Sequence, residues 1–378
     1  MKIFKLLDKF CYFRYNEIEG KSMKLIHCSD IHLGASMRTH LSSEQAKTRQ
    51  IELLATFSKM IDYAVENKIS GIIIAGDLFD TDECSPKTRE FLLANISQAT
   101  SVEFYYLCGN HDENNVIKQG ELPKNLHIFG SSWTTFSLEN VKITGATLGT
   151  KNIYPELKLD ENDLNIVVLH GQDDYSPYSP KEDTVFIHEL ENKNIDYLAL
   201  GHLHTYSCKP LDKRGDYCYS GCLEGRGWDE CGKKGFVLLN IENQHITHKF
   251  IPFSERTLHE FEVDVTKLPS TQDVINFINN LTCDIPSNDF VRIVLIGKVE
   301  VSNSISGKLI KAKLDYKFFC FEVKDKTQIA INIEQYKADV SLAGEFVRCV
   351  EASDLPQEEK NRIINLGLKT INGEEVEL

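Results

Sequence analysis

Five short clusters of acidic, imidazole and amide side chains, each following an apolar run, most strongly constrain what this chain can fold into. They start at Ser29, Gly76, Gly109, His170 and Gly201 and read Ser-Asp-Ile-His, Gly-Asp-Leu-Phe-Asp, Gly-Asn-His-Asp, His-Gly and Gly-His-Leu-His. The apolar runs have the length and composition of buried strands. An Asp or Asn behind one strand commonly caps a helix or fixes a turn, but five clusters in order are poorly explained that way. They indicate a functional site beyond the ends of several strands.

The spacing of apolar residues predicts an open sheet in the first third of the chain. Strands are expected at 25–28, 71–75 and 104–107, with helices at 43–67 and 86–99 between them. This βαβαβ order is typical of a largely parallel sheet, in which ligands bind beyond the carboxyl ends of the strands. Shorter apolar runs predict a second sheet packed against the first. They lie at 126–129, 142–147, 166–169, 197–200, 236–240 and 246–250.

The sequence changes character after Phe253. From 258 to 378, strand-like and helix-like segments alternate without any of the five clusters, and a helix is expected at 271–281. We predict an α/β (α+β) chain with a two-sheet catalytic domain at 23–255 and a smaller α+β domain at 258–378. The helical run at 355–368 has two interpretations, a docking segment for a partner or the last helix of that domain.

The first 22 residues raise a separate question. Charged residues interrupt their apolar positions, so no secretion signal is predicted. A short amphipathic helix at a membrane surface is a weaker alternative. Met23 stands at the natural start of the first strand, and bacterial codons for Glu19-Gly20 would form a purine-rich ribosome-binding sequence. We therefore expect residues 1–22 to be a misannotated extension.

Composition describes an ordinary globular chain. The 378 residues are 42% hydrophobic, and 42 Lys+Arg against 56 Asp+Glu give a net charge of −14, which argues against a generally basic surface for nucleic acid. No apolar run is long enough to span a bilayer, so no membrane partner is expected. Eleven cysteines without regular spacing predict reduced thiols in a cytoplasm. For four of them, a structural zinc site stays open beside the plainer interpretation as loop and core thiols. They are Cys208, Cys218, Cys222 and Cys231.

The clusters have the composition of a metal centre. Mixed carboxylate, amide and imidazole donors suit manganese, iron or zinc better than calcium or magnesium, which prefer oxygen ligands. The candidate ligands are Asp30, His32, Asp77, Asn110, His170, His202 and His204. Seven are too many for one ion, and two ions need a bridge that a carboxylate such as Asp77 can provide. Water activated between two ions would suit in-line attack on phosphorus. The remaining histidines are more simply interpreted as hydrogen-bonded core or surface residues.

These motifs together resemble the calcineurin-like metallophosphoesterases, whose fold is an αββα sandwich of two sheets between helices. The resemblance covers about 24–251 and implies two groups of ligands that share Asp77. One metal would be held by Asp30, His32, Asp77 and His204, and the other by Asp77, Asn110, His170 and His202. The family also implies that His111 is a catalytic group at the phosphate rather than a ligand, with Asp80 orienting its ring.

Finer likeness narrows the expected substrate. The stretches starting at His27, Ala75 and Tyr219 resemble DNA repair exonucleases of SbcD and YhaO type. That group implies a nuclease acting on DNA ends, a cap domain, a homodimer and an SMC-like coiled-coil ATPase partner. Manganese is the metal expected for the mixed donors, with iron or zinc as alternatives. The loop at 224–234 carries a basic and aromatic group that could contact DNA or form a plain turn around a buried Trp. Its members are Arg226, Trp228, Lys233 and Lys234.

Two rival functions remain open. A phosphatase or small-molecule phosphodiesterase, including one for cyclic nucleotides, would use the same metals, and the acidic net charge modestly favours it. The chain could also be a non-catalytic subunit that binds a partner and uses its metals structurally. Digestion of DNA beside small phosphodiesters separates these alternatives.

Overall fold

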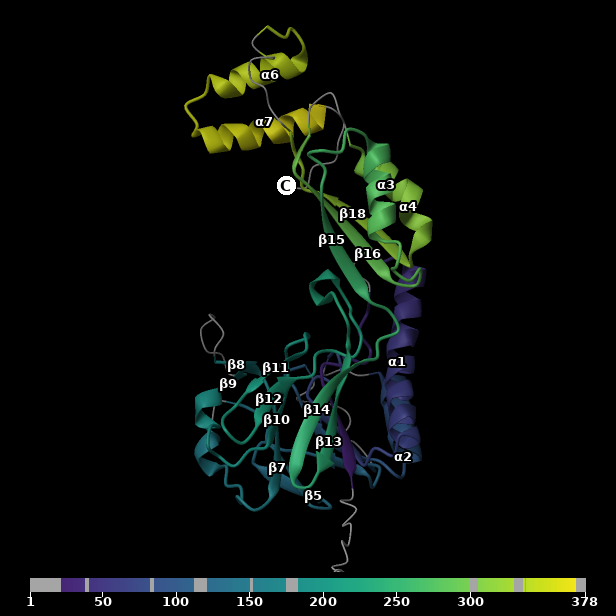
Figure 1. Ribbon diagram of the computed structural model, residues 1–378, viewed down its shortest axis with the longest axis vertical. Coiled ribbons are helices and arrows are strands. Elements are labelled where there is room, and N and C mark those ends of the chain that lie inside the picture. The colour runs from purple at the N-terminus through teal and green to yellow at the C-terminus, as the bar shows by residue number, and fades with distance from the viewer. Residues whose placement is uncertain are drawn as a thin grey trace, which may run out of the picture. The chain divides into compact units, whose positions relative to one another are not determined.

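The predicted strand ends belong to two six-stranded sheets in the first of two compact units of this computed structural model (Figure 1). The first unit comprises residues up to Arg226 together with Lys233–Glu255, and the second comprises Gly227–Gly232 and residues from Arg256 onward. The structure describes residues 22–37, 41–81, 85–111, 121–149, 152–174, 183–299, 305–329, 336 and 338–371. Residues 1–21, and so nearly all of the predicted extension, lie outside the described residues.

Sheet one has the strand order β14-β13-β1-β2-β3-β4. Its βαβαβ part is present as predicted and consists of β1 (Met23–Cys28), α1 (Ser43–Glu66), β2 (Gly71–Ala75), α2 (Pro86–Gln98) and β3 (Glu103–Leu107). These three strands and β4 (Leu126–Ile128) pair in parallel. Each helix starts after a serine cap, Ser42 in a capping box with Gln45 and Ser85 before a proline. The parallel order brings three of the strand ends to one edge of the sheet.

Three strands predicted for the second sheet join sheet one instead. β13 (Gly235–Glu242) lies antiparallel to β1, with Leu239 opposite Leu25, and β14 (His245–Pro252) pairs with β13 as the edge strand. The run at 126–129 becomes β4. The prediction failed because an apolar run indicates a strand without specifying its neighbour. β13 lies inside the first sheet, between β14 and β1, because the face that carries Val237, Leu239 and Ile241 is apolar and buried.

Sheet two has the order β11-β12-β10-β7-β6-β5. Its strands are β5 (Thr134–Leu138), β6 (Val141–Gly145), β7 (Leu164–His170), β10 (Tyr197–Gly201), β11 (Ser207–Pro210) and β12 (Asp216–Tyr219). β6, β7, β10 and β12 are parallel, while β5 and β11 close the edges antiparallel. Two short strands, β8 (Gln172–Asp173) and β9 (Thr184–Val185), pair beside the end of β7. The predicted second sheet is therefore present, with different edges.

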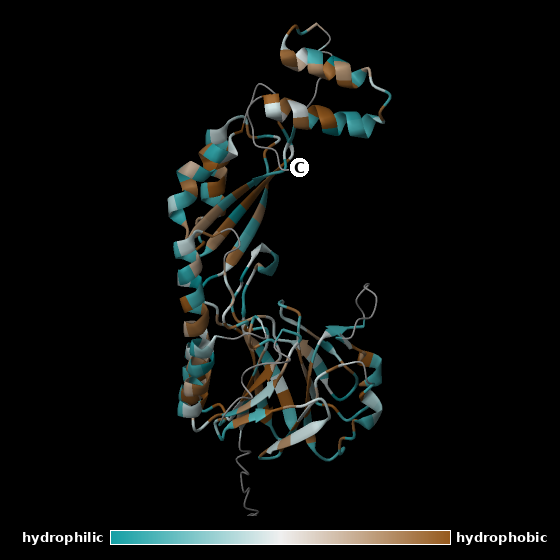
Figure 2. Cartoon of the chain, turned by 180° about the vertical axis from the view of Figure 1, so that it is seen from behind, coloured by the Kyte–Doolittle hydropathy of each residue, from teal (hydrophilic) through white to brown (hydrophobic). Residues whose placement is uncertain are grey.

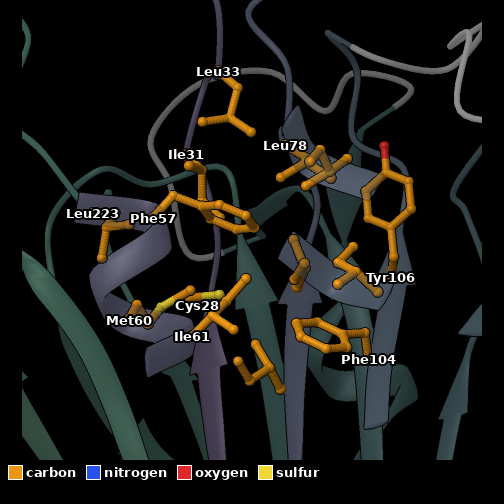
Figure 3. Close-up of a cluster of buried hydrophobic side chains, with 14 of the residues drawn as sticks. Cys28, Ile31, Leu33, Phe57, Met60, Ile61, Leu78, Phe104, Tyr106 and Leu223 are labelled. Atoms are coloured by element: carbon orange, nitrogen blue, oxygen red, sulfur yellow. The ribbon is translucent and has the colours of Figure 1, made fainter. Parts of the chain in front are cut away.

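Alternation along the strands divides the core into layers. In β2, Ile72 and Ile74 belong to the apolar cluster that includes Phe57 of α1 and Leu92 of α2, while Ile73 belongs to the cluster shared with sheet two. Figure 3 shows part of the first cluster, with Phe57, Met60 and Phe104 labelled. Another apolar layer covers the outer face of sheet two. Figure 2 shows the same division, with hydrophobic residues concentrated along the strands and alternating with hydrophilic ones along α1. The metal-ligand clusters thus follow strands that are buried along nearly their whole length.

A buried ion pair fastens α1 to the loop after β12. Arg49 is 1% exposed, and its Nη2 donates to Glu224 Oε2 at 2.8 Å and to the carbonyl of Gly225 at 3.0 Å. The other carboxylate oxygen of Glu224 accepts from the Thr56 hydroxyl and from the amide of Glu255. Every oxygen of this buried carboxylate is therefore bonded, as a buried charge requires.

Replacing Arg49 with methionine is expected to destabilise the first unit by about 3–5 kcal/mol, because Glu224 would stay buried without its counter-ion. Urea unfolding followed by circular dichroism measures the change. Lys47→Met, at an exposed position on the same helix, is the matched control and should change stability by less than about 0.5 kcal/mol. A loss below about 1 kcal/mol for Arg49→Met would contradict the prediction.

The second unit is built on a three-stranded parallel sheet. Its strands are β15 (Leu258–Asp264), β16 (Phe290–Ile296) and β18 (Cys320–Asp325), beside the short pair β17 (Lys298–Val299) and β19 (Gln328–Ile329). The helix predicted at 271–281 is present as α3 (Thr271–Leu281) and packs with α4 (Gly307–Leu314) on one sheet face. α6 (Leu342–Glu351) and α7 (Gln357–Ile371) form a hairpin around Ile364 and Leu368. None of the described helices has the length and hydropathy to cross a membrane.

The prediction of reduced thiols is wrong for one pair, since Cys208 and Cys218 form a disulfide. They face each other on the antiparallel strands β11 and β12, which brings their sulfurs together. Seven further cysteines among the described residues are free thiols. Cys222 and Cys231 do not join the pair, because their Sγ atoms donate to the carbonyls of His204 and Trp228. The four-cysteine zinc set considered from the sequence is therefore not assembled.

Candidate metal centre

The seven predicted ligands come from five segments that meet above the carboxyl ends of both sheets. β1, β2 and β3 deliver the first three clusters, while β7 and β10 deliver the histidines. Four ligand residues have left-handed backbone angles, with φ of 51° at Asp30, 51° at His32, 48° at Asp77 and 103° at His202. Such angles are uncommon for residues other than glycine and mark functional sites. The backbone turns sharply where each strand ends, which aims these side chains into one place.

Asp77 lies at the centre of the arrangement. Its Oδ1 accepts the amide of His111 at 3.0 Å, while Oδ2 lies 3.8 Å from His32 Nε2 and 3.4 Å from His170 Nε2. Burial alone would raise the pKa of this carboxyl. The hydrogen bond and charge of His170, with the amide of His111, outweigh burial and hold the pKa well below its usual value. One oxygen of Asp77 is thus positioned between two histidines of different groups.

The first group surrounds Asp30. His204 Nε2 lies 3.7 Å from Asp30 Oδ1 and 3.3 Å from His32 Nε2. Asp30 is held from behind by the amide of His202 at 3.0 Å and by the hydroxyl of Ser29 at 2.5 Å. Asp30 and His32 are almost fully buried, at 1% and 0% exposure, so their donor atoms face inward. Asp30, His32 and His204 form one of the donor clusters compact enough for a metal ion.

The second group surrounds His170. Its Nδ1 lies 2.9 Å from the carbonyl of Ala75, which can only accept, so Nδ1 carries a proton and Nε2 is left for a ligand. Nε2 lies 3.0 Å from Asn110 Oδ1, and the ring packs edge-on against His202. Burial lowers the pKa of His170, but Asp77 outweighs it and raises the pKa to about 9. His202 turns its Nε2 toward Asp183 at 3.7 Å, which leaves Nδ1 on the other side of the ring.

Two glycines allow the close approach of these groups. A Cβ added at Gly76, where φ is +92°, would lie 2.0 Å from His170 Nδ1, and one at Gly109 would lie 2.1 Å from Asp77 Oδ1. Neither contact is possible for real atoms. The glycines in the Gly-Asp and Gly-Asn-His motifs are thus required by packing at the centre itself.

One donor separation in each group fits a shared metal ion, while those of 3.7 Å between Asp30 and His204 and 3.8 Å between Asp77 and His32 are longer. Ligand atoms that each lie about 2.1 Å from one ion are about 3.0 Å apart when adjacent in an octahedron and about 3.4 Å apart in a tetrahedron. The separations of 3.3 Å between His32 and His204, and of 3.0 Å between His170 and Asn110, fall in this range. Asp30, Asp77 and His170 form a further compact donor cluster. The arrangement can therefore hold two divalent cations with Asp77 shared between them.

His111 and Asp80 differ in detail from the sequence prediction. The ring of His111 is held at Nδ1 by the backbone carbonyl of Asp80 at 2.9 Å, not by its carboxylate. The carboxylate instead lies 3.5 Å from His32 Nδ1 and accepts from Arg226 Nη1 at 3.0 Å. The contact with His32, together with Arg226, lowers the pKa of Asp80. The backbone of Asp80 orients His111, while its side chain supports a predicted metal ligand.

The predicted DNA-contact group is divided. Arg226 lies against the centre, with Nη2 3.2 Å from His204 Nδ1, while Lys233 is exposed. Lys234 is only 2% exposed because its ammonium donates to the carbonyl of His204 at 2.6 Å. Trp228 belongs to the second unit, where the Arg292 guanidinium lies over its ring and Phe290 packs edge-on against it. The four residues therefore do not belong to one compact unit, and the ammonium of Lys234 is bound within the chain.

Sequence reasoning missed the supporting residues of the centre. The Ser29 hydroxyl joins Asp30 to Ser220 at 2.8 Å, and Arg49 clamps the loop that carries Arg226. In the sequence, Ser29 and Ser220 are only neighbours of motif residues. Because they are 191 positions apart, their contact could not be predicted from the sequence. For Arg49, the only indication in the sequence was a charged residue at a helix position where the apolar pattern expects a buried one.

Comparison with known proteins bears on the kind of domain to which these residues belong. A family model described as calcineurin-like phosphoesterase matches residues 23–206. YhaO of Bacillus subtilis, named an uncharacterised metallophosphoesterase, is 28% identical over 269 residues, 65% of this chain and 64% of that protein. The DNA double-strand break repair protein Mre11 of Sulfurisphaera tokodaii is 28% identical over 208 residues, 50% of this chain and 51% of that protein.

A third relative is the SbcD component of the nuclease SbcCD from Staphylococcus saprophyticus, which is 26% identical over 280 residues, 64% of this chain and 71% of that protein. The chain spans less than two thirds of the length of the YhaO and Mre11 relatives, at 64% and 51%. The family model and the two donor groups both indicate a metal-dependent phosphoesterase. Residues 23–206 form a calcineurin-like metallophosphoesterase domain, and the relatives of this chain include YhaO, SbcD and Mre11 proteins.

Proposed function

We propose that this chain hydrolyses phosphodiester bonds at DNA ends with two divalent metal ions, as the nuclease subunit of an SbcCD-like complex. The observation that carries the proposal is the position of Asp77 Oδ2, which lies between His32 at 3.8 Å and His170 at 3.4 Å. A shared carboxylate of this kind is what two-metal phosphoesterases require. The relatives suggest that the substrate is DNA, since SbcD is named as a nuclease subunit and Mre11 as a double-strand break repair protein.

In this proposal the ligands keep their two groups. One ion is held by Asp30, His32, Asp77 and His204, and the other by Asp77, Asn110, His170 and His202. Manganese is the proposed metal, with iron or zinc as alternatives for the same mixed donors. When bound, the ions would supply Lewis-acid activation of water and of the phosphate oxygens. The protein's part is to fix the donors in advance through buried strands and paired supporting groups.

His111 is the proposed catalytic residue. Its ring is exposed, and Nδ1 is occupied by the carbonyl of Asp80, so Nε2 is the atom that can reach a substrate oxygen. From there it would stabilise charge on the phosphate and deliver a proton to the departing 3′ oxygen. The amide of His111 also binds Asp77 at 3.0 Å, which fixes the distance between this group and the bridging carboxylate.

Arg226 and Lys233 remain the proposed DNA contacts. Arg226 is held between Asp80 and His204, on a loop clamped by Arg49, so its charge is placed at the centre with little freedom. The surface of the chain as a whole is acidic, with a net charge of −14. We therefore propose that an SMC-like coiled-coil ATPase and a second copy of this chain complete the grip on DNA.

A phosphatase or small-molecule phosphodiesterase is the second candidate. The burial of Lys234 and the acidic net charge favour it, because both reduce the surface available to a long polyanion. Such an enzyme would use the same ligands and the same histidine.

The test is digestion of end-labelled duplex and single-stranded DNA by the full chain with manganese, with and without an SMC-like coiled-coil ATPase from the same organism. Cyclic nucleotides and bis-p-nitrophenyl phosphate are assayed in parallel. Shortened DNA products support the proposal. Hydrolysis of the small esters alone, even with the ATPase present, would identify the second candidate. No hydrolysis by a protein that binds two metal ions would indicate a non-catalytic subunit.

A further inference from the structure

A second cluster of metal-binding side chains lies in the first unit and uses none of the strand-end residues. Cys208 and Cys218 come from β11 and β12 of sheet two, and His248 comes from β14 at the edge of sheet one. One ligand atom of each lies within 4.8 Å of the others. Asp216 adds a carboxylate, whose Oδ2 lies 3.1 Å from His248 Nε2. Two sulfurs, an imidazole and a carboxylate thus meet where the two sheets come together.

The separations match a tetrahedral zinc site. With Zn–S of about 2.3 Å and Zn–N of about 2.0 Å, a sulfur and a nitrogen on one ion lie about 3.5 Å apart, and a nitrogen and an oxygen about 3.3 Å apart. The distance from Cys208 Sγ to His248 Nε2 is 3.6 Å, and that from His248 Nε2 to Asp216 Oδ2 is 3.1 Å. The two sulfurs, now joined, would have to separate, and the Asp216 carboxylate, which lies outside the compact cluster of Cys208, Cys218 and His248, would have to turn toward them.

The surroundings favour a soft metal over a solvated cation. Cys218 is fully buried and packs in the core between the sheets, and Cys208 is half-buried against the same core. The ring of Tyr197 packs beside His248 with centroids 5.9 Å apart. Thiolate and imidazole donors in a partly dry site select zinc over magnesium or calcium.

The oxidation state of the pair decides which form exists. Cys208 and Cys218 are joined in the structure, and a disulfide has no thiolate to offer a metal. The seven free cysteines among the described residues, however, suit a reducing compartment, where a dithiol would reduce an accessible disulfide. In that exchange the dithiol gives up two electrons and two protons and becomes a disulfide, while Cys208 and Cys218 become two thiols.

We propose that the reduced pair, with His248 and Asp216, binds one zinc ion that joins the edges of the two sheets. Binding releases the two thiol protons, while the neutral imidazole and the carboxylate enter unchanged. The ion would replace the covalent link between β11 and β12 and extend it to β14. The site is separate from the dinuclear centre, and the proposal does not depend on the proposed nuclease function.

Cobalt(II) substitution tests the proposal. The full chain is reduced with dithiothreitol, freed of it by gel filtration without oxygen, and titrated with cobalt(II) and then zinc(II). We expect a thiolate-to-cobalt charge-transfer band in the near ultraviolet that saturates at one ion per chain and disappears when zinc is added. The carboxylate and histidine ligands at the strand ends cannot give this band. Zinc should also raise the unfolding temperature of the reduced protein.

Three variants locate the site. Cys208→Ser should abolish the band and weaken zinc binding by at least about 10–100-fold, whereas Cys349→Ser, at an exposed free thiol, should leave both unchanged. His248→Gln keeps both thiols and should weaken zinc binding similarly, so it decides the matter if Cys208→Ser does not fold. A reduced wild-type protein with no thiolate band, or a band unchanged in His248→Gln, would overturn the proposal and leave the pair as a disulfide only.

Discussion

Replacing Asp77 with alanine is expected to lower phosphodiester hydrolysis by at least about 10³-fold and to reduce the metal content below one ion per chain. The reason is its position, since Oδ2 lies between His32 and His170 at 3.8 and 3.4 Å, so both donor groups lose a ligand together. Metal ions supply several kcal/mol of transition-state stabilisation, and each 1.36 kcal/mol is a factor of ten in rate. Metal analysis by mass spectrometry and hydrolysis of bis-p-nitrophenyl phosphate measure the two effects.

Asp62→Ala is the matched control, because Asp62 is an exposed aspartate on α1. It should keep full metal content and full activity. Circular dichroism separates metal loss from unfolding. A folded Asp77→Ala protein that still binds two ions per chain would show that this carboxylate is not shared between them.

Replacing His111 with alanine should lower hydrolysis without lowering the metal content, unlike the Asp77 substitution. Hydrolysis is expected to fall by about 10²–10⁴-fold while metal content stays at the wild-type value. The side chain of His111 is exposed and its Nδ1 is bound to the carbonyl of Asp80, so its loss removes no donor from either group. The amide that binds Asp77 belongs to the backbone and survives the substitution.

The leaving group provides a sharper test of this role. If His111 protonates the departing oxygen, the variant should lose least with bis-p-nitrophenyl phosphate, whose leaving group is a weak base, and most with DNA. An equal loss on both substrates would leave His111 only a role in stabilising phosphate charge. Metal content that falls together with activity would make it a structural support for the ligands.

The convergence of these side chains was predictable because its signal is local. Each ligand stands within a few positions of a buried strand, as Asp30 does after β1 and Asp77 after β2, and parallel strands bring such ends to one edge. Neither feature requires knowledge of distant contacts. The order of the clusters along the chain was therefore enough to assemble the seven donors.

The contacts that sequence reasoning could not resolve join distant positions. β13 and β1 are both apolar, and only the folded chain decides that Leu239 lies opposite Leu25. Lys234 looks like a surface cation, but the carbonyl that accepts from its ammonium is 30 positions away, at His204. For Asp80, the sequence predicted the contact with His111 but not the atom that makes it, which is the backbone carbonyl and not the carboxylate. Hydrophobic periodicity predicts whether a segment forms a helix or a strand, but the residues that it contacts depend on the packing of the whole chain.

The second unit is assembled from two stretches of chain, and this affects how it can be exchanged between proteins. A single cut after Glu255 would remove Phe290 and Arg292 but leave Trp228 behind, with its indole stripped of the ring and guanidinium that cover it. It would also break the bond from the amide of Gly232 to the carbonyl of Leu258. Moving the second unit into another protein therefore requires two segments, Gly227–Gly232 and the residues from Arg256 onward.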